Sequence, residues 1–178
     1  KIPVILIHGI HGNQWPDGER AGNCFDCGNI PYPHYFRGLI ERMNGGLYND
    51  YYKTYKFHYV SDKHSLIEIA AALKDHVDDL IRQNPSLDAK QIVLVAHSMG
   101  GLVARAYMNK FRVDAGSDHR YTGRLAGEKI SKLITLGTPH HGTPLANGGA
   151  RVVSGFWGRH LDWEAAFGVM DWKWDLLE

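Results

Sequence analysis

The sequence lacks several features that define common protein classes. It contains only 2 cysteines among its 178 residues, with no internal repeat and no low-complexity segment. Its longest apolar runs are strand-sized, well short of the roughly 20 residues that cross a bilayer. The 20 Lys and Arg residues nearly balance the 19 Asp and Glu residues, so charge does not favour nucleic acid or an anionic membrane as the main partner. With 44% hydrophobic residues, we expect one soluble globular domain with its own core.

Both cysteines lie in one C-x-x-C pair, formed by Cys24 and Cys27 in a segment rich in Gly, Asn and Pro. Such a pair is compatible with a disulfide that staples the loop, with two free thiols, with half of a zinc site or with a redox centre. The redox interpretation is the weakest, because the motif does not open a predicted helix. We expect the loop-stapling disulfide, with free thiols as the main alternative.

Strand-length apolar runs alternate with helical patterns along the chain. The runs at 3–7, 51–60, 92–96 and 130–136 predict strands, and helical spacing predicts helices at about 34–43, from 65 to before Pro85, and after 98. Ser65 and Glu68 form a capping-box pattern at the start of the second helix. The segment 12–33 is rich in turn-forming residues and predicts a long irregular loop. The alternation predicts an α/β fold, with a mostly parallel sheet and helices on both faces.

The stretch QIVLVAHSMGGLVARAYM, residues 91–108, predicts a strand that runs almost directly into a helix. Ser98 lies at the turn, and the small residues Ala96 and Gly100 would let the strand and helix pack closely. A nucleophilic serine on such a turn projects its hydroxyl above the sheet. The alternative is a serine that only caps the helix, which is common at helix starts.

Two further motifs follow predicted strands. HGIHG comes after the strand at 3–7, and GTPHHG comes after the strand at 130–136. Because reactive sites in such sheets lie at the carboxyl ends of the strands, we expect both motifs to cluster with Ser98. A turn after the first strand can supply a backbone donor, so the N–H groups of Ile10 and Met99 are the predicted oxyanion donors.

Together, HGIHG, AHSMGG and TLGTPHHGTPLA resemble the motifs of the α/β-hydrolase superfamily, specifically its bacterial lipases and related esterases. The similarity covers about residues 3–146, with Ala96 in place of a more usual glycine. The resemblance implies an α/β-hydrolase fold and hydrolysis of carboxylic esters by a Ser, acid and His triad, without an organic cofactor. It assigns Ser98 as the nucleophile, and it gives His8 and His97 a role in supporting loops rather than in exchanging protons.

The acid and the base of this triad are harder to find. In the superfamily the chain order is Ser, then Asp or Glu, then His. After the strand at 130–136 the histidines are His140, His141 and His160, and the family counterpart of the first two lines the site without acting as the base. We therefore expect that carboxyl-terminal strands are missing and that the acid and His lie beyond Glu178. The alternative is a compact variant that pairs Asp118 or Asp162 with His160.

The last 22 residues hold four of the five tryptophans. By resemblance we divide the chain into an α/β-hydrolase core at 1–144 and a lid-like helical, Trp-rich segment at 145–178. Trp157, Trp163 and Phe167 are the candidate substrate-binding residues, because aromatic side chains suit an element that alternates between a site and a lipid interface. A helix packed on the core would explain the same pattern.

The 11 histidines permit a metal hypothesis, since some bacterial lipases bind calcium or zinc. However, His58 and His64 fall on different predicted elements, and no tight ligand pair is evident. A structural metal therefore has no clear ligand set, and we expect that no cofactor is required.

The expected function is hydrolysis of lipid or other apolar acyl esters through an acyl-enzyme on Ser98. Two alternatives stay open: an acyltransferase or amidase on the same scaffold, and a non-catalytic module that binds lipid or protein. The expected partners are an ester or lipid substrate and a lipid–water interface, with no nucleic acid and no transmembrane segment. The family resemblance and the cysteine pair favour a secreted or extracytoplasmic protein.

Overall fold

A parallel sheet forms the centre of the molecule. The computed structural model describes residues 1–10, 36–61, 64–84, 87, 91–114 and 121–142, and the backbone of residues 19–20, 24–25 and 31–32. The sheet has the order β3-β5-β1-β6-β7, and every neighbouring pair is parallel. Its strands are β3 (Cys24–Phe25), β5 (Tyr52–Tyr59), β1 (Ile2–Ile7), β6 (Ile92–His97) and β7 (Ile130–Leu136). The short strands β2 (Glu19–Arg20) and β4 (Pro31–Tyr32) pair separately and antiparallel.

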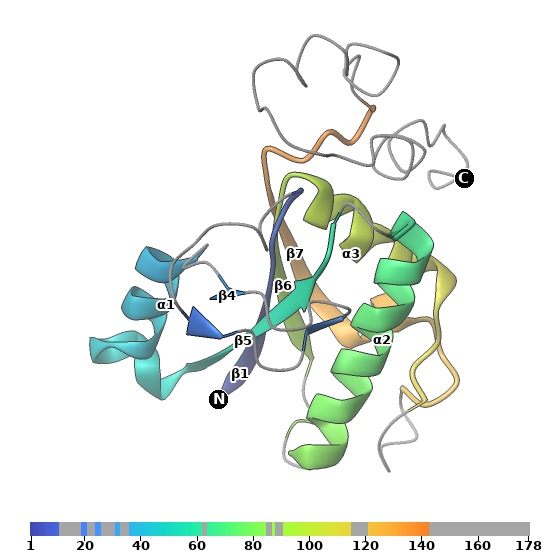
Figure 1. The fold of residues 1–178 in the computed structure, drawn as a ribbon. Coiled ribbons are helices and arrows are strands. Elements are labelled where there is room, and N and C mark those ends of the chain that lie inside the picture. Colours follow the sequence, from blue (N-terminus) through green and yellow to red (C-terminus); the bar gives the residue numbers. More distant parts are fainter. Residues whose placement is uncertain are drawn as a thin grey trace, which may run out of the picture.

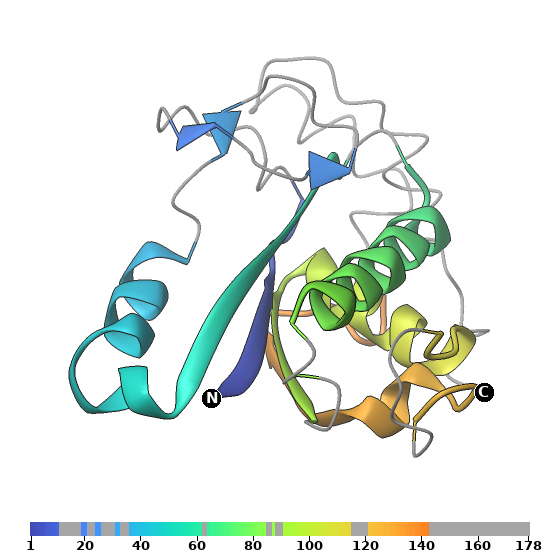
Figure 2. The same ribbon diagram turned by 90° about the horizontal axis from the view of Figure 1, so that it is seen from below.

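Helices cover both faces of this sheet. Helix α1 (Arg37–Asn44) lies on one face, and α2 (Leu66–Gln83) and α3 (Met99–Lys110) lie side by side on the other (Figures 1 and 2). Two 3-10 helices complete the described elements, η1 (Gly46–Asp50) before β5 and η3 (Ala126–Lys129) before β7. The α/β fold with helices on both faces is confirmed.

The start of α2 follows the local rule that its sequence predicts. The Ser65 hydroxyl accepts a hydrogen bond from the backbone N–H of Glu68 at 3.3 Å. The Glu68 carboxylate in turn accepts one from the Ser65 backbone N–H at 2.8 Å, which completes the capping box. The bonds that the Ser65 backbone N–H and hydroxyl donate to the Glu68 carboxylate lower the pKa of Glu68. The capping box as a whole fixes the first turn of the helix that covers the core.

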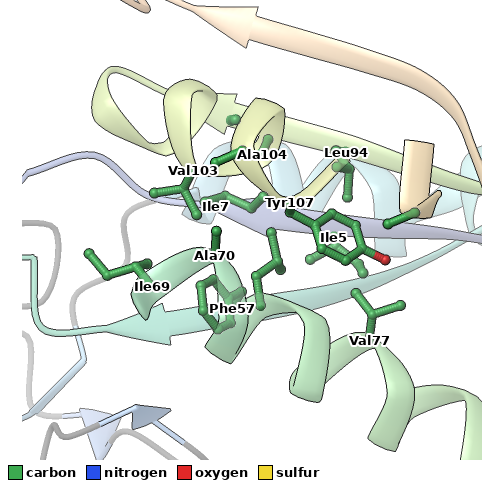
Figure 3. Close-up of a cluster of buried hydrophobic side chains, with 14 of the residues drawn as sticks. Ile5, Ile7, Phe57, Ile69, Ala70, Val77, Leu94, Val103, Ala104 and Tyr107 are labelled. Atoms are coloured by element: carbon green, nitrogen blue, oxygen red, sulfur yellow. The ribbon is translucent and has the colours of Figure 1, made fainter. Parts of the chain in front are cut away.

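The main core lies between the sheet and the pair α2 and α3. Ile5 and Ile7 point from β1 into this layer, where Figure 3 shows them among Phe57, Val103 and Tyr107. The alternate β1 residues face α1 in a smaller cluster made of Val4, Leu6, Phe36 and Val95. Because successive strand residues point to opposite faces, the apolar run of β1 is buried on both sides.

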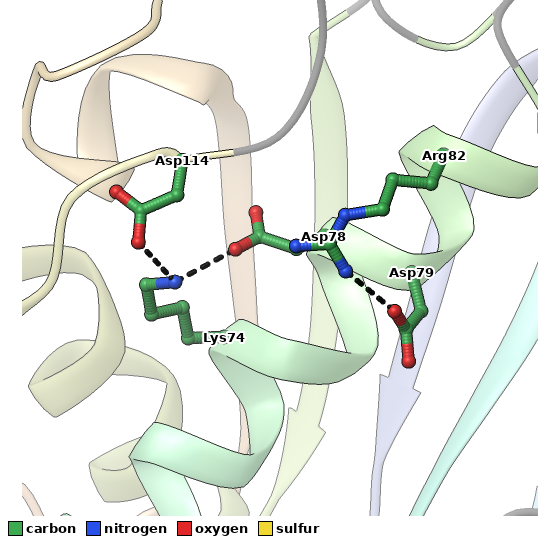
Figure 4. A network of polar contacts seen from close by, with 5 residues as sticks. All are labelled: Lys74, Asp78, Asp79, Arg82 and Asp114. Carbon is green, nitrogen blue, oxygen red and sulfur yellow. Dashed lines mark hydrogen bonds and ion pairs between the residues drawn. The ribbon is translucent and has the colours of Figure 1, made fainter.

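A part-buried ion cluster ties α2 to the segment after α3. The Lys74 ammonium lies 2.7 Å from a carboxylate oxygen of Asp78 and 2.6 Å from one of Asp114 (Figure 4). Asp78 is only 2% exposed, so Lys74 compensates a carboxylate that water does not reach.

Two sequence-based expectations are corrected. The first helix runs from Arg37 to Asn44, so it begins about three residues later and ends one residue later than predicted. The segment 12–33 is not irregular throughout, because it contains β2, β3 and β4. Strand β3 pairs with the open edge of β5, where an extended segment satisfies backbone groups that would otherwise lack partners. A pattern rich in Gly, Asn and Pro conceals such short pairings.

Candidate active site

Ser98 occupies a sharp turn between β6 and α3. Its backbone has φ 52° and ψ −127°, and it is the one non-glycine residue with a positive φ in the part of the chain that the structure describes. An L-residue in this region is strained by about 1–3 kcal/mol, and such strain concentrates at functional sites. The predicted strand, turn and helix are therefore present, and the turn has the geometry of a nucleophile elbow.

The hydroxyl of Ser98 is not used to cap the helix. Ser98 stands at the N-cap position of α3, yet its side chain makes no capping hydrogen bond. Its backbone is held instead, because its N–H donates to Leu136 at 2.8 Å and its carbonyl accepts from Gly101 at 3.1 Å. The capping alternative for this serine is thus contradicted by the geometry.

The loop after β1 lies directly against this turn. A Cβ added at Gly9 would lie 2.7 Å from the Cβ of Ser98, and one added at Gly100 would overlap the carbonyl oxygen of His8. Both positions therefore require glycine. The predicted clustering of HGIHG with Ser98 is found, and Ile10 follows immediately in the same loop.

The two predicted oxyanion donors are the N–H groups of Met99 and Ile10, the residues that follow Ser98 and Gly9. Met99 is the first residue of α3, so its N–H is one of those that have no carbonyl partner within the helix. The positive end of the helix dipole adds to the attraction for negative charge at this position. Ile10 is half-buried in the loop that touches Ser98.

His8 is completely buried between this loop and β5. Burial lowers the pKa of its imidazole to about 4, so the ring is neutral at physiological pH. Its Nδ1 lies 2.7 Å from the carbonyl oxygen of Gly9, and its Nε2 accepts the N–H of Tyr59 at 3.3 Å. With both nitrogens in use, His8 supports the loop and does not act as a proton acceptor.

The loop after β7 also contacts α3. The side chain of Thr138 fills the space beside Gly101, where a Cβ would overlap it. The His140 ring lies between the Arg105 guanidinium, 3.0 Å from Nδ1, and the Thr135 hydroxyl, 3.1 Å from Nε2. Since a guanidinium only donates, Nδ1 accepts and Nε2 carries the proton. His140 is therefore fully engaged and is not placed to activate Ser98.

A groove of about 570 Å³ opens beside this histidine. Its walls come from α3, β7 and the loop that follows, namely Arg105, Met108, Asn109, Leu133, Thr135, His140 and His141. Partial burial lowers the pKa of His140, and the nearby Arg105 and His141 lower it further, which favours the neutral ring.

Several predicted residues lie outside the described residues. They are the three substrate-binding candidates Trp157, Trp163 and Phe167, the alternative acid and base residues Asp118, Asp162 and His160, and the side chains of Cys24 and Cys27. The lid-like segment 145–178 and the cysteine pairing therefore stay predictions.

The described part of the chain has neither a cluster of metal-ligating side chains nor a membrane-spanning helix. Within it, no three His, Cys, Asp or Glu side chains come together in a way that could hold a metal ion. None of its helices combines the length and apolar character needed to span a bilayer.

Comparison with known proteins identifies the family to which this geometry belongs. Residues 1–153 match the family of the PGAP1-like alpha/beta domain. The chain belongs to this family. A triacylglycerol lipase of Pseudomonas fragi is 24% identical over 154 residues, which make up 83% of the chain but 38% of that lipase. The chain thus belongs to a lipase-like α/β-hydrolase family, and it spans well under half the length of that curated relative.

Solved structures agree with this domain in fold. Lipase BlEst2 of Bacillus licheniformis in its mature form superposes with a TM-score of 0.56 at 19% identity, over 96% of this chain and 56% of that one. Phospholipase PlaB of Legionella pneumophila superposes with a TM-score of 0.52 at 23% identity, over 86% of this chain and 29% of that one. Both likenesses show the α/β-hydrolase fold.

Sequence reasoning missed the residues of this PGAP1-like domain that hold the two loops in place. Tyr59 contacts the loop after β1, and Arg105 with Thr135 contacts the loop after β7. Strand alternation indicates that Tyr59 faces the α2 side, but it does not reveal a partner 51 residues away. Only the register of β1 against β5, in which Ile7 lies opposite Phe57, brings His8 next to Tyr59, the second residue after Phe57.

Proposed function

We propose that this domain provides the nucleophile and the oxyanion donors of a serine hydrolase that cleaves lipid or other apolar acyl esters. The observation that carries the proposal is the strained, uncapped Ser98 in contact with the loop that contains Ile10. A strained turn costs free energy, and Ser98 does not offset that cost by capping the helix that it begins. The likeness to a triacylglycerol lipase and a phospholipase supports the choice of substrate class.

In the proposed reaction the Ser98 oxygen attacks the ester carbonyl as its proton passes to a general base. The tetrahedral oxyanion accepts hydrogen bonds from the N–H groups of Ile10 and Met99, and losing one such donor typically costs about 3 to 4 kcal/mol of barrier. Collapse expels the alcohol, which takes the proton from the base, and leaves an acyl-enzyme. Water then attacks with the same base, releases the acid and restores the Ser98 hydroxyl.

The general base and its orienting acid would come from outside the described residues. His8 and His140 are excluded from this role because protein atoms occupy both nitrogens of each ring. The proposal requires no metal and no organic cofactor. Trp157, Trp163 and Phe167 stay candidates for the acyl pocket, and secretion stays the expected location.

The test is covalent labelling of the natural protein with an alkyl fluorophosphonate, followed by peptide mass spectrometry. We expect one adduct on Ser98, with labelling and ester hydrolysis both lost in Ser98→Ala. Ser131→Ala is the control, because Ser131 lies on β7 and its hydroxyl bonds only to the Ile92 carbonyl among the described residues. Hydrolysis that persists in Ser98→Ala would refute the assignment, and product analysis with competing alcohols or amines separates hydrolysis from acyl transfer.

A further inference from the structure

Tyr59, on the neighbouring strand β5, makes several contacts with the loop that follows β1. Tyr59 is the last residue of β5 and is completely buried. Its ring stacks on the His8 imidazole with centroids 4.1 Å apart and planes 9° from parallel. Its hydroxyl donates to the His8 carbonyl oxygen at 2.6 Å, and its backbone N–H donates to the His8 Nε2 at 3.3 Å. Three different groups of one residue thus contact one neighbour.

These contacts define the protonation state of the ring between them. A backbone N–H only donates, so the His8 Nε2 accepts and carries no proton. The carbonyl of Gly9 only accepts, so Nδ1 carries the proton. His8 is therefore neutral and has a fixed tautomer, and its contacts link the position of the loop to that of Tyr59.

The His8 carbonyl group, which accepts the Tyr59 hydroxyl, lies next to the turn that contains Ser98. The His8 oxygen accepts the Tyr59 hydroxyl and also lies so close to Gly100 that a side chain there would overlap it. Gly9, the next residue, touches Ser98. The oxygen therefore cannot shift toward α3, and the 2.6 Å hydrogen bond opposes a shift or rotation away from the tyrosine.

The direction of the Ile10 N–H depends on how the His8 peptide group is held. The N–H of Ile10 follows Gly9, and a glycine imposes almost no preference on the backbone that flanks it. The orientation of that N–H must therefore come from contacts on either side of Gly9. On the His8 side, the hydroxyl of Tyr59 holds the His8 carbonyl, and the His8 Nδ1–H donates to the Gly9 carbonyl, which belongs to the peptide group that carries the Ile10 N–H.

We propose that Tyr59 is a positioning residue that sets the direction of the Ile10 oxyanion donor. The inference rests on the proposed function, because Ile10 has this role only if Ser98 performs acyl chemistry. Tyr59 contacts neither substrate nor the reacting atoms, so its hydroxyl acts only through the His8 carbonyl. A donor that is misdirected weakens binding of the oxyanion and leaves binding of the neutral ester almost unchanged.

The same strand offers a matched control. Tyr55 lies on the same face of β5, and its hydroxyl is buried with no hydrogen-bond partner among the described residues. Tyr55→Phe and Tyr59→Phe therefore remove the same oxygen atom from the same strand, but only the hydroxyl of Tyr59 has a hydrogen bond to the loop.

The experiment measures kcat, KM and the affinity for an alkyl trifluoromethyl ketone, which binds serine hydrolases as a tetrahedral oxyanion, in the natural protein. We expect Tyr59→Phe to lower kcat and the ketone affinity by about tenfold each, with KM within about twofold of the wild-type value. Tyr55→Phe should match the wild type in all three. The concentration of active sites is titrated with the fluorophosphonate, so that a loss of folded protein does not count as a loss of kcat.

A rescue variant covers the case in which Tyr59→Phe does not fold. Incorporation of 4-aminophenylalanine at position 59 keeps a donor at the same place and should restore most of the kcat. The positioning role is refuted if Tyr59→Phe keeps the wild-type kcat and ketone affinity per active site. It is also refuted if the substitution raises KM and leaves kcat unchanged. In both cases the Ser98 assignment stands. If the fluorophosphonate does not label Ser98 in the wild type, the proposed function fails and takes this inference with it.

Discussion

Acidification should destabilise this protein through histidines that are buried in the neutral form. Burial lowers the pKa of His8 to about 4, of His58 to about 3 and of His76 to about 4, from an ordinary value of 6.5. His8 is fully buried and His58 is 8% exposed. In the unfolded chain the same rings would titrate near 6.5, so the two states bind different numbers of protons below that pH.

The sign and size of the effect follow from these values. Between pH 6.5 and 4 the unfolded state takes up protons that the folded state cannot, so the stability is fully present above pH 6.5 and is lost as the pH falls. For His8 alone the free energy of unfolding should drop by about 2.5 kcal/mol between pH 7 and pH 4.5. The summed loss for three such rings is comparable to the total free energy of unfolding of a domain, about 5–15 kcal/mol. We therefore expect partial or complete unfolding near pH 4.5.

Urea titrations at half-unit steps from pH 7 to pH 4.5 measure this dependence. His76→Leu isolates one contribution, because the His76 Nε2 is buried without a hydrogen-bond partner among the described residues. We expect the variant to be as stable as the wild type at pH 7 and to lose about 2 kcal/mol less on acidification. A free energy of unfolding that is the same at pH 7 and pH 4.5 would show that these rings are not held neutral by the fold.

Two further substitutions test the packing and the ion cluster. Gly100→Ala should cost about 3 kcal/mol of thermal or urea stability, because the added Cβ meets backbone that cannot move aside, whereas Gly38→Ala in α1 meets nothing within 4 Å and should be neutral or stabilising. Asp78→Asn should cost about 2 kcal/mol, since it removes a buried partner of Lys74, while Asp79→Asn breaks only an exposed pair (Figure 4) and should cost less than about 0.5 kcal/mol. Equal urea midpoints for the two members of either comparison would contradict the reasoning.

Short-range patterns determined the elements and the candidate nucleophile. The capping box at Ser65, the apolar alternation of β5 and the small residues around Ser98 all act within a few positions of the chain, where the backbone fixes which atoms can meet. For the same reason, the sequence indicated that three motifs follow parallel strands and therefore meet at one edge. The family match to a PGAP1-like domain agrees with those motifs.

The tertiary structure alone decided how the site is held. The contact of Tyr59 with His8 and that of Arg105 with His140 join residues 51 and 35 positions apart, and each depends on strand register and helix placement rather than on local spacing. The same holds for β3, whose pairing with β5 exists because that strand has an open edge. Nothing in the sequence near Tyr59 distinguishes its hydroxyl from that of Tyr55, since both lie on one face of one strand. Only the end of the neighbouring strand gives one of them a partner.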